Sequence, residues 1–370
     1  IILILDKKDT DMSQVLRAKA EQQYAHELAA LKEHDKKQRP AQWELSPNAV
    51  VDYLMGTTLP DGTEISAKYI GNRRLMEIAV ATLATDRALL LLGVPGTAKS
   101  WVSEHLAAAI SGNSTLLIQG TAGTSEDTLR YSWNYAQLLA KGPTEEALVQ
   151  SPMLRAMRTG KIARIEELTR IPADVQDTLI TLLSEKNLPV PELGIEYQAV
   201  QGFSVIATAN NRDKGVNELS SALKRRFNTV ILPPPATIAE EIEIVQQRVA
   251  SLGRSLSLPE IQPLDQHIKT LVTIFRELRE GKTVDGKQKL KSTTGTLSTA
   301  EAISVMSHSW AMSGHFGDGN LNAHDLVAGL QGAIVKDPVQ DVVPWKEYVE
   351  TVIKQREGWN EIYQACRDLE

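Results

Sequence analysis

The segment ALLLLGVPGTAKS, residues 88–100, joins an apolar run to a glycine-containing loop that ends in Lys-Ser. Ala88 to Leu92 has the composition of a strand buried on both faces of a parallel sheet, and a helical pattern starts at Ser100. A phosphate-binding loop needs small residues that let backbone N–H groups face phosphate oxygens, a lysine for the β and γ phosphates, and a hydroxyl for Mg²⁺. The residues predicted to bind a nucleotide are therefore Gly93, Val94, Pro95, Gly96, Thr97, Ala98, Lys99 and Ser100.

The loop departs from the usual pattern at Ala98, where glycine normally precedes the lysine. Alanine adds one methyl group, which we expect the loop to tolerate with a negative φ at this residue. The alternative interpretation is an ordinary strand-to-helix turn that binds nothing. The strand before the loop and the helix after it place a helix N-terminus against an anion, which favours the phosphate interpretation.

Apolar strand-like runs alternate with helical runs between Arg73 and Leu232. This alternation predicts an α/β fold with a parallel sheet. The expected strands are 88–92, 115–118, 161–165 and 203–207, and the expected helices are 100–110, 153–158 and 173–184. After Pro233-Pro234-Pro235 the pattern is helical, at 236–252, 263–279, 298–313, 323–334 and 345–368.

These patterns divide the chain into four expected parts. The first, residues 1–44, contains a helix over 13–37, and we expect residues 1–11 to be non-native because Met12-Ser13 is an ordinary start. The others are a nucleotide-binding core at 45–235, a helical lid at 236–335 and a C-terminal helical extension at 336–370.

The composition is that of a folded globular chain. Its 370 residues are 42% hydrophobic and 23% charged, which excludes a disordered or fibrous protein. The longest apolar run is far shorter than the roughly 20 residues that cross a bilayer, so we expect no membrane helix. The single cysteine, Cys366, excludes an internal disulfide and a cysteine-based zinc site, and it fits a reducing, cytoplasmic location. A net charge of −6 gives no overall attraction to nucleic acid.

Acidic residues on a strand next to the loop are needed to hold Mg²⁺ and orient the attacking water. Glu166 and Glu167 follow the expected strand 161–165. We expect Glu166 to hold the metal together with Ser100, and Glu167 to polarise the water. The alternative is a solvated surface pair. Asn210 ends another apolar strand and is expected to hold the water or a γ-phosphate oxygen, although asparagine there is also a common turn former.

The order of these motifs along the chain resembles that of the MoxR-like branch of the AAA+ ATPases, and the resemblance covers residues 45–335. The phosphate loop of that family reads G-x-P-G-x-A-K-[ST], which residues 93–100 match at each fixed position, so Ala98 is a family residue. The sensor strand A-T-x-N matches Thr208 and Asn210, and L-x-x-A-x-x-D-R-F corresponds to residues 219–227. The resemblance implies an AAA+ αβα sandwich with a parallel sheet, that is, a P-loop NTPase, followed by an all-α lid and a C-terminal helical extension.

The resemblance also assigns Arg226 as an arginine finger, with Arg225 in the place of the usual aspartate. The alternative is that both are surface charges. Glu166 replaces the family's aspartate, and we expect Glu166→Asp to be tolerated because it restores the family residue.

The expected lid departs from the family where its third helix begins. Residues 298–301 read Ser-Thr-Ala-Glu, where the family has S-P-R with an arginine that contacts the γ-phosphate. Lys289 and Lys291 are candidate replacements.

The function implied by the resemblance is Mg²⁺-dependent ATP hydrolysis by a ring, expected to be a hexamer, with ATP bound between subunits. Such proteins act as chaperone-like remodellers with a partner that carries a von Willebrand factor A domain. Tyr131, Trp133 and Tyr135 fall in the family's helix-2 insertion, where they either grip a substrate or, as we favour, pack in the core. Glu166 and the missing lid arginine favour a first alternative, a slow or non-hydrolysing ATP-gated scaffold. A nucleic-acid motor is a second, which needs a basic stripe that the sequence does not show.

Overall fold

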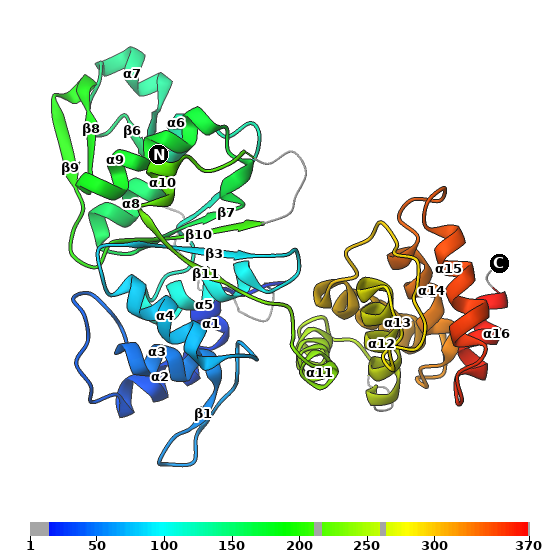
Figure 1. The fold of residues 1–370 in the computed structure, drawn as a ribbon. Helices are drawn as coiled ribbons and strands as arrows, with labels where there is room; N and C mark the ends of the chain where they lie inside the picture. Colours follow the sequence, from blue (N-terminus) through cyan, green and yellow to red (C-terminus); the bar gives the residue numbers. More distant parts are fainter. Residues whose placement is uncertain (1–14, 211–216, 260–263, 369–370) are drawn as a thin grey trace, which may run out of the picture. The chain divides into compact units, whose positions relative to one another are not determined.

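The computed structural model describes residues 15–210, 217–259 and 264–368. They form two bodies, one made mainly of residues 18–233 and the other mainly of residues from 234 onward. Figure 1 shows the first in blue to green and the second in yellow-green to red. No helix in the described ranges is long and apolar enough to span a membrane. The expected segment 1–11 lies outside these ranges.

The first body is built on a five-stranded parallel sheet with the strand order β11-β3-β10-β7-β4. Every residue of β7 and β10 is buried, which explains why most of their residues are apolar. The four strands expected from the sequence are confirmed, with ends shifted by a few residues. The strands are β3 (Ala88–Gly93), β4 (Leu117–Gln119), β7 (Ile162–Glu166), β10 (Ser204–Asn210) and β11 (Phe227–Ile231).

Helices cover both faces of this sheet, so the predicted αβα sandwich is confirmed (Figure 1). Because side chains alternate along a strand, Leu89 and Leu91 pack on one face while Ala88 and Leu90 pack on the other. The first face is covered by α3 (Pro47–Met55), α4 (Arg73–Leu83) and α5 (Lys99–Ser111). The second is covered by α6 (Glu126–Leu129), α8 (Pro152–Thr159), α9 (Ala173–Glu185) and α10 (Ser221–Lys224).

Three small antiparallel sheets accompany the main one. β5 (Tyr131–Trp133) pairs with β6 (Leu148–Gln150), and α7 (Tyr135–Lys141) lies between them in sequence. The other pairs are β1 (Thr57–Thr58) with β2 (Glu64–Ile65), and β8 (Asn187–Val190) with β9 (Ile195–Gln198). Short 3₁₀ turns occur at η2 (Leu168–Arg170) and η3 (Pro191–Leu193).

The N-terminal helix is shorter than the expected 13–37. It consists of α1 (Ala20–Gln23) and α2 (Ala25–His34), which are separated at Tyr24. The Tyr24 ring packs edge-on against His105, with centroids 5.1 Å apart. The Asp35 carboxylate accepts hydrogen bonds from the backbone and hydroxyl of Ser46 at 2.6 and 2.7 Å, which turns the chain towards α3. These tertiary contacts override the helical propensity of the segment.

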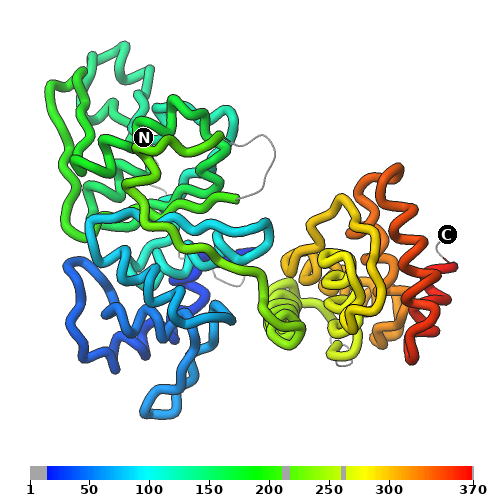
Figure 2. Tube along the Cα trace, viewed as in Figure 1, coloured from blue at the N-terminus to red at the C-terminus, as the bar shows by residue number. Residues whose placement is uncertain are grey.

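The second body is all-α, as expected (Figure 2). Its helices pack around one apolar core. The expected helix 345–368 is broken, because Gly358 adopts a φ of 79° and Arg356 bonds to the buried carboxylate of Glu277 at 2.6 Å. The elements are α11 (Ile238–Ser255), α12 (Asp265–Glu280), α13 (Thr299–Phe316), α14 (Ala323–Ile334), α15 (Val342–Tyr348), the π-helical turn η4 (Val349–Ile353) and α16 (Asn360–Asp368).

Candidate nucleotide-binding site

The loop of residues 93–100 connects β3 to α5 at the carboxyl edge of the parallel sheet. Strand register brings other polar residues to this edge, because Asn210 pairs with Gly93 and Ala207 pairs with Ile165, which places Thr208 opposite Glu166. Ligands of open α/β sheets bind at the carboxyl ends of the strands. The topology therefore gathers the predicted loop, Glu166 and Asn210 in one place.

Lys99 points back into the loop that precedes it. Its side chain is buried, and its Nζ donates to the carbonyls of Gly93 at 3.1 Å and Val94 at 2.9 Å. The ammonium group is thus held inside the loop by backbone oxygens, with α5 starting beside it. A cation and a helix N-terminus at one position form an anion-binding arrangement.

Ala98 corrects one expectation from the sequence, because its φ is +62° and not negative. It is the left-handed N-cap of α5, a conformation that the turn from loop to helix imposes. Such a conformation costs a residue with a Cβ about 1–2 kcal/mol. The alanine is tolerated here at the cost of local strain.

Glu166 is buried, with 4% of its surface exposed, and its carboxylate accepts four hydrogen bonds. Oε2 accepts from Ser100 Oγ and Thr208 Oγ1, both at 2.6 Å. Oε1 accepts from Ser103 Oγ and Arg164 Nη2, both at 2.9 Å. This residue is therefore not part of a solvated surface pair, and its two oxygens have different environments.

Glu167 adopts a left-handed conformation, with a φ of 56°, which turns its side chain away from that of Glu166. Its carboxylate accepts from Asn210 Nδ2 at 3.0 and 3.3 Å, and 26% of the side chain is exposed. The Glu167 backbone N–H donates to Thr208 Oγ1 at 3.1 Å. One carboxylate is therefore buried beside Ser100, while the other is open to water and held by Asn210.

Sequence reasoning did not assign Arg164, Ser103 or Gly120 to the site. Arg164 is 4% exposed and interrupts the apolar run of β7, a pattern that signals a paired buried charge. Ser103 lies one helical turn after Ser100. Gly120 N–H donates to the Glu166 carbonyl at 2.7 Å, and a Cβ on Gly120 would lie 2.4 Å from the carbonyl oxygen of Glu167, so no larger residue fits.

Arg226 is not part of this group of residues. It lies next to Phe227, which pairs with Ala88 at the amino end of β3, whereas the loop follows the carboxyl end. Its Nε donates to Ser184 Oγ at 2.8 Å and its Nη1 to the Ala222 carbonyl at 2.9 Å. The structure therefore separates Arg226 from the loop of its own chain by the length of a strand.

The aromatic residues of the insertion have different environments. Tyr131 is buried and its hydroxyl donates to Glu192 Oε2 at 2.8 Å, while Trp133 packs partly buried against the same core. Burial and the Glu192 carboxylate raise the pKa of Tyr131 to about 12. Tyr135, in contrast, is 70% exposed on α7, so core packing explains only two of the three residues.

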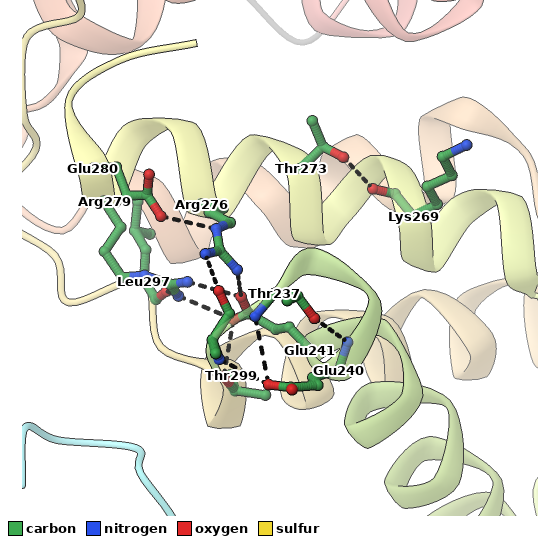
Figure 3. A network of polar contacts seen from close by, with 11 residues as sticks. Thr237, Glu240, Glu241, Lys269, Thr273, Arg276, Arg279, Glu280, Leu297 and Thr299 are labelled. Carbon is green, nitrogen blue, oxygen red and sulfur yellow. Dashed lines mark hydrogen bonds and ion pairs between the residues drawn. The ribbon is translucent and has the colours of Figure 1, made fainter. Parts of the chain in front are cut away.

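In the second body, an arginine from α12 lies at the start of α13 (Figure 3). Arg279 forms a two-pronged ion pair with the fully buried Glu241, at 2.8 and 3.0 Å, and donates to the Leu297 carbonyl at 2.7 Å. Thr299 Oγ1 donates to the same carboxylate at 2.9 Å. Lys291, a suggested replacement for the lid arginine, instead pairs with Glu347 at 2.6 Å.

Comparison with protein families gives two matches. The family described as AAA domain (dynein-related subfamily) matches residues 88–227, and the family described as YehL-like AAA+ ATPase C-terminal domain matches residues 239–369. The chain is 41% identical over 355 residues to the protein YehL of Escherichia coli strain K12, covering 94% of this chain and 95% of that protein.

More distant similarity extends to other bacteria. An uncharacterised Staphylococcus aureus protein of strain USA300 is 28% identical over 151 residues, which cover 40% of this chain and 56% of that protein. Among solved structures, NtrX from Brucella abortus in complex with ADP has a TM-score of 0.48 at 13% identity, covering 81% of this chain and 66% of that chain. A putative ATPase from Cytophaga hutchinsonii has a TM-score of 0.39 at 19% identity, covering 91% of this chain and 98% of that chain.

Proposed function

Because the chain belongs to the YehL-like AAA+ ATPases, we propose that it binds ATP in the loop of residues 93–100 and hydrolyses it with the help of Mg²⁺. The observation that carries this proposal is the pair of carboxylates at the sheet edge. Glu166 lies 2.6 Å from the Ser100 hydroxyl, and Glu167 is open to water and bonded to Asn210. A phosphate loop, a metal-binding carboxylate and a base are the parts that ATP hydrolysis requires.

The residues beside the loop fit a magnesium ion. Mg²⁺ prefers oxygen ligands from hydroxyl and carboxylate groups, which Ser100 Oγ and Glu166 Oε2 provide next to each other. When bound, the ion would neutralise charge on the β and γ phosphates. Lys99 would contact the same phosphates from within the loop.

Glu167 is the proposed general base. A carboxylate that is partly exposed and held in place is suited to accept a proton from a water molecule. The Asn210 amide donates to this carboxylate and thereby sets its orientation. Asn210 is 8% exposed, so its position is fixed by the surrounding strand residues.

We further propose that the active form is a ring, a hexamer as in MoxR-like proteins, in which Arg226 acts on the ATP of a neighbouring subunit. The place of Arg226 at the amino end of the sheet supports this, because it lies far from the loop of its own chain. Remodelling of a protein client, with a partner that carries a von Willebrand factor A domain, is the proposed role. Tyr135 and Leu139, which are 70% and 89% exposed on α7, support a protein-contacting surface. Cys366 is the single cysteine of the sequence, so no internal disulfide can form, which suits the proposed cytoplasmic location.

A slow or non-hydrolysing scaffold is the second candidate. The four donors around Glu166 favour it, because they compete with a metal ion for the carboxylate oxygens. Steady-state release of phosphate separates the two candidates.

The test compares the wild type with Lys99→Ala, using fluorescent ATP titration and phosphate release. Lys99→Ala should abolish ATP binding, because it removes the cation held in the loop. Lys141→Ala, which changes an exposed lysine on α7, is the matched control and should bind normally. Unchanged affinity in Lys99→Ala would refute the assignment of the loop. Tight binding by the wild type without phosphate release above the Lys99→Ala level would favour the scaffold.

A further inference from the structure

Arg164 and Ser103 form a buried pair behind the Glu166 carboxylate. Arg164 Nε donates to Ser103 Oγ at 2.8 Å, and Ser103 Oγ in turn donates to Glu166 Oε1 at 2.9 Å. Arg164 also reaches Oε1 directly, through Nη2 at 2.9 Å. Ser103 is fully buried and Arg164 is 4% exposed. One oxygen of the carboxylate is therefore held by two donors that solvent does not reach.

Arg164 is itself attached to the start of α5. Its Nη2 donates to the Ser100 carbonyl at 3.1 Å and its Nη1 to the Ser114 carbonyl at 3.0 Å. The guanidinium thus links β7, which carries Glu166, to the helix that carries Ser100. A planar group with several fixed donors restrains both partners at once.

We propose that Arg164 and Ser103 are positioning residues for the proposed magnesium site: they hold Glu166 Oε1 inside the protein and leave Oε2 at the Ser100 hydroxyl. This inference rests on the proposed function. It explains how a glutamate can serve at a position where the family has an aspartate, although its longer side chain would otherwise displace the carboxylate. The extra methylene is taken up by binding Oε1 behind the site.

The same geometry revises the expectation that Glu166→Asp is tolerated. Removing one methylene withdraws the carboxylate by about 1.5 Å. Aspartate therefore cannot reach Ser103 and Arg164 while also meeting Ser100. It would leave the buried Arg164 guanidinium without its carboxylate partner.

The experiment measures the affinity for a fluorescent ATP analogue over a titration of Mg²⁺, and again in excess EDTA, so it does not depend on hydrolysis. Ser103→Ala should raise the half-saturating Mg²⁺ concentration about tenfold, as removal of an outer-shell hydrogen bond does at other metal sites. Affinity in EDTA should stay unchanged. Ser111→Ala is the matched control, because Ser111 is a buried serine of the same helix whose hydroxyl donates to the carbonyls of Ala107 and Asn113. This variant should leave the Mg²⁺ response as in the wild type.

Two further variants separate positioning from a general effect on folding. Ser103→Thr keeps the hydroxyl and should restore most of the wild-type response. In a Glu166→Asp background, Ser103→Ala should add little, because aspartate no longer contacts Ser103. The inference would be overturned if Ser103→Ala shifted the half-saturating Mg²⁺ concentration no more than Ser111→Ala does. It would also be overturned if the shifts caused by Ser103→Ala and Glu166→Asp multiplied in full in the double variant. If Mg²⁺ had no effect on the affinity of the wild type for the ATP analogue, the proposed function would instead be refuted.

Discussion

Replacing Arg226 by alanine separates an arginine that acts within its own subunit from one that acts on a neighbour. Arg226 precedes Phe227, which pairs with Ala88, and the loop begins five residues later at Gly93. At about 3.3 Å per residue, the strand puts about 16 Å between Arg226 and the loop.

This distance sets the size of any effect within one subunit. At 16 Å and an effective dielectric constant of 20, two unit charges interact by about 1 kcal/mol, and by about 0.3 kcal/mol in water. An arginine acting through its own field would therefore change the rate by less than about sixfold. An arginine that contacts the phosphate of ATP bound to a neighbouring subunit raises the rate of hydrolysis by a factor of roughly 10³ to 10⁵.

Arg226→Ala should therefore bind ATP normally and lose more than about 10³-fold in phosphate release. Arg225→Ala, at the adjacent exposed position, is the control and should retain activity. The decisive assay mixes Arg226→Ala with Lys99→Ala in equal amounts. If the ring is the active unit, about a quarter of the interfaces combine an intact loop with an intact arginine, and activity returns. A loss below tenfold in Arg226→Ala, or no recovery in mixed rings verified by native mass spectrometry, would refute the reasoning.

Three other predictions follow from individual contacts. Glu167→Gln should keep ATP affinity and lose at least 10²-fold in turnover, because the amide cannot accept a proton. A mild effect on turnover would indicate that Glu167 is a surface carboxylate and not the general base. Ala98→Gly removes the strain of a φ of +62° and should raise the free energy of unfolding by up to about 1 kcal/mol in urea titrations, whereas a loss of stability would contradict the strain. Glu241→Gln should lower the free energy of unfolding by about 3 kcal/mol, because the buried carboxylate pairs with Arg279. Glu243→Gln, on the exposed side of the same helix, should change it by less than about 0.5 kcal/mol, and equal melting temperatures for the two variants would exclude this role for the Glu241 carboxylate.

The sequence was sufficient to locate four of the five strands, because parallel strands buried on both faces are mostly apolar. It did not predict β11, in which three of five residues are exposed. The runs around Leu90, Ile165 and Val205 carry that signal without reference to any other part of the chain. The spacing in residues 93–100 likewise predicted a phosphate-binding loop, since phosphate binding requires small residues, a lysine and a hydroxyl in a fixed local order.

Only the tertiary structure decided what depends on contacts between distant residues. The two glutamates are adjacent in sequence, yet the left-handed backbone at Glu167 and the donors from α5 and β10 give them different environments. Arg164 and Ser103 are separated by 61 residues, so no local pattern indicates that they share a hydrogen bond. The break at Tyr24 and the φ of Ala98 also arise from surrounding structure, which overrides local preferences of a few tenths to about 1–2 kcal/mol. The local order of residues determined where helices and strands form, whereas strand register and burial determined which side chains meet at the sheet edge.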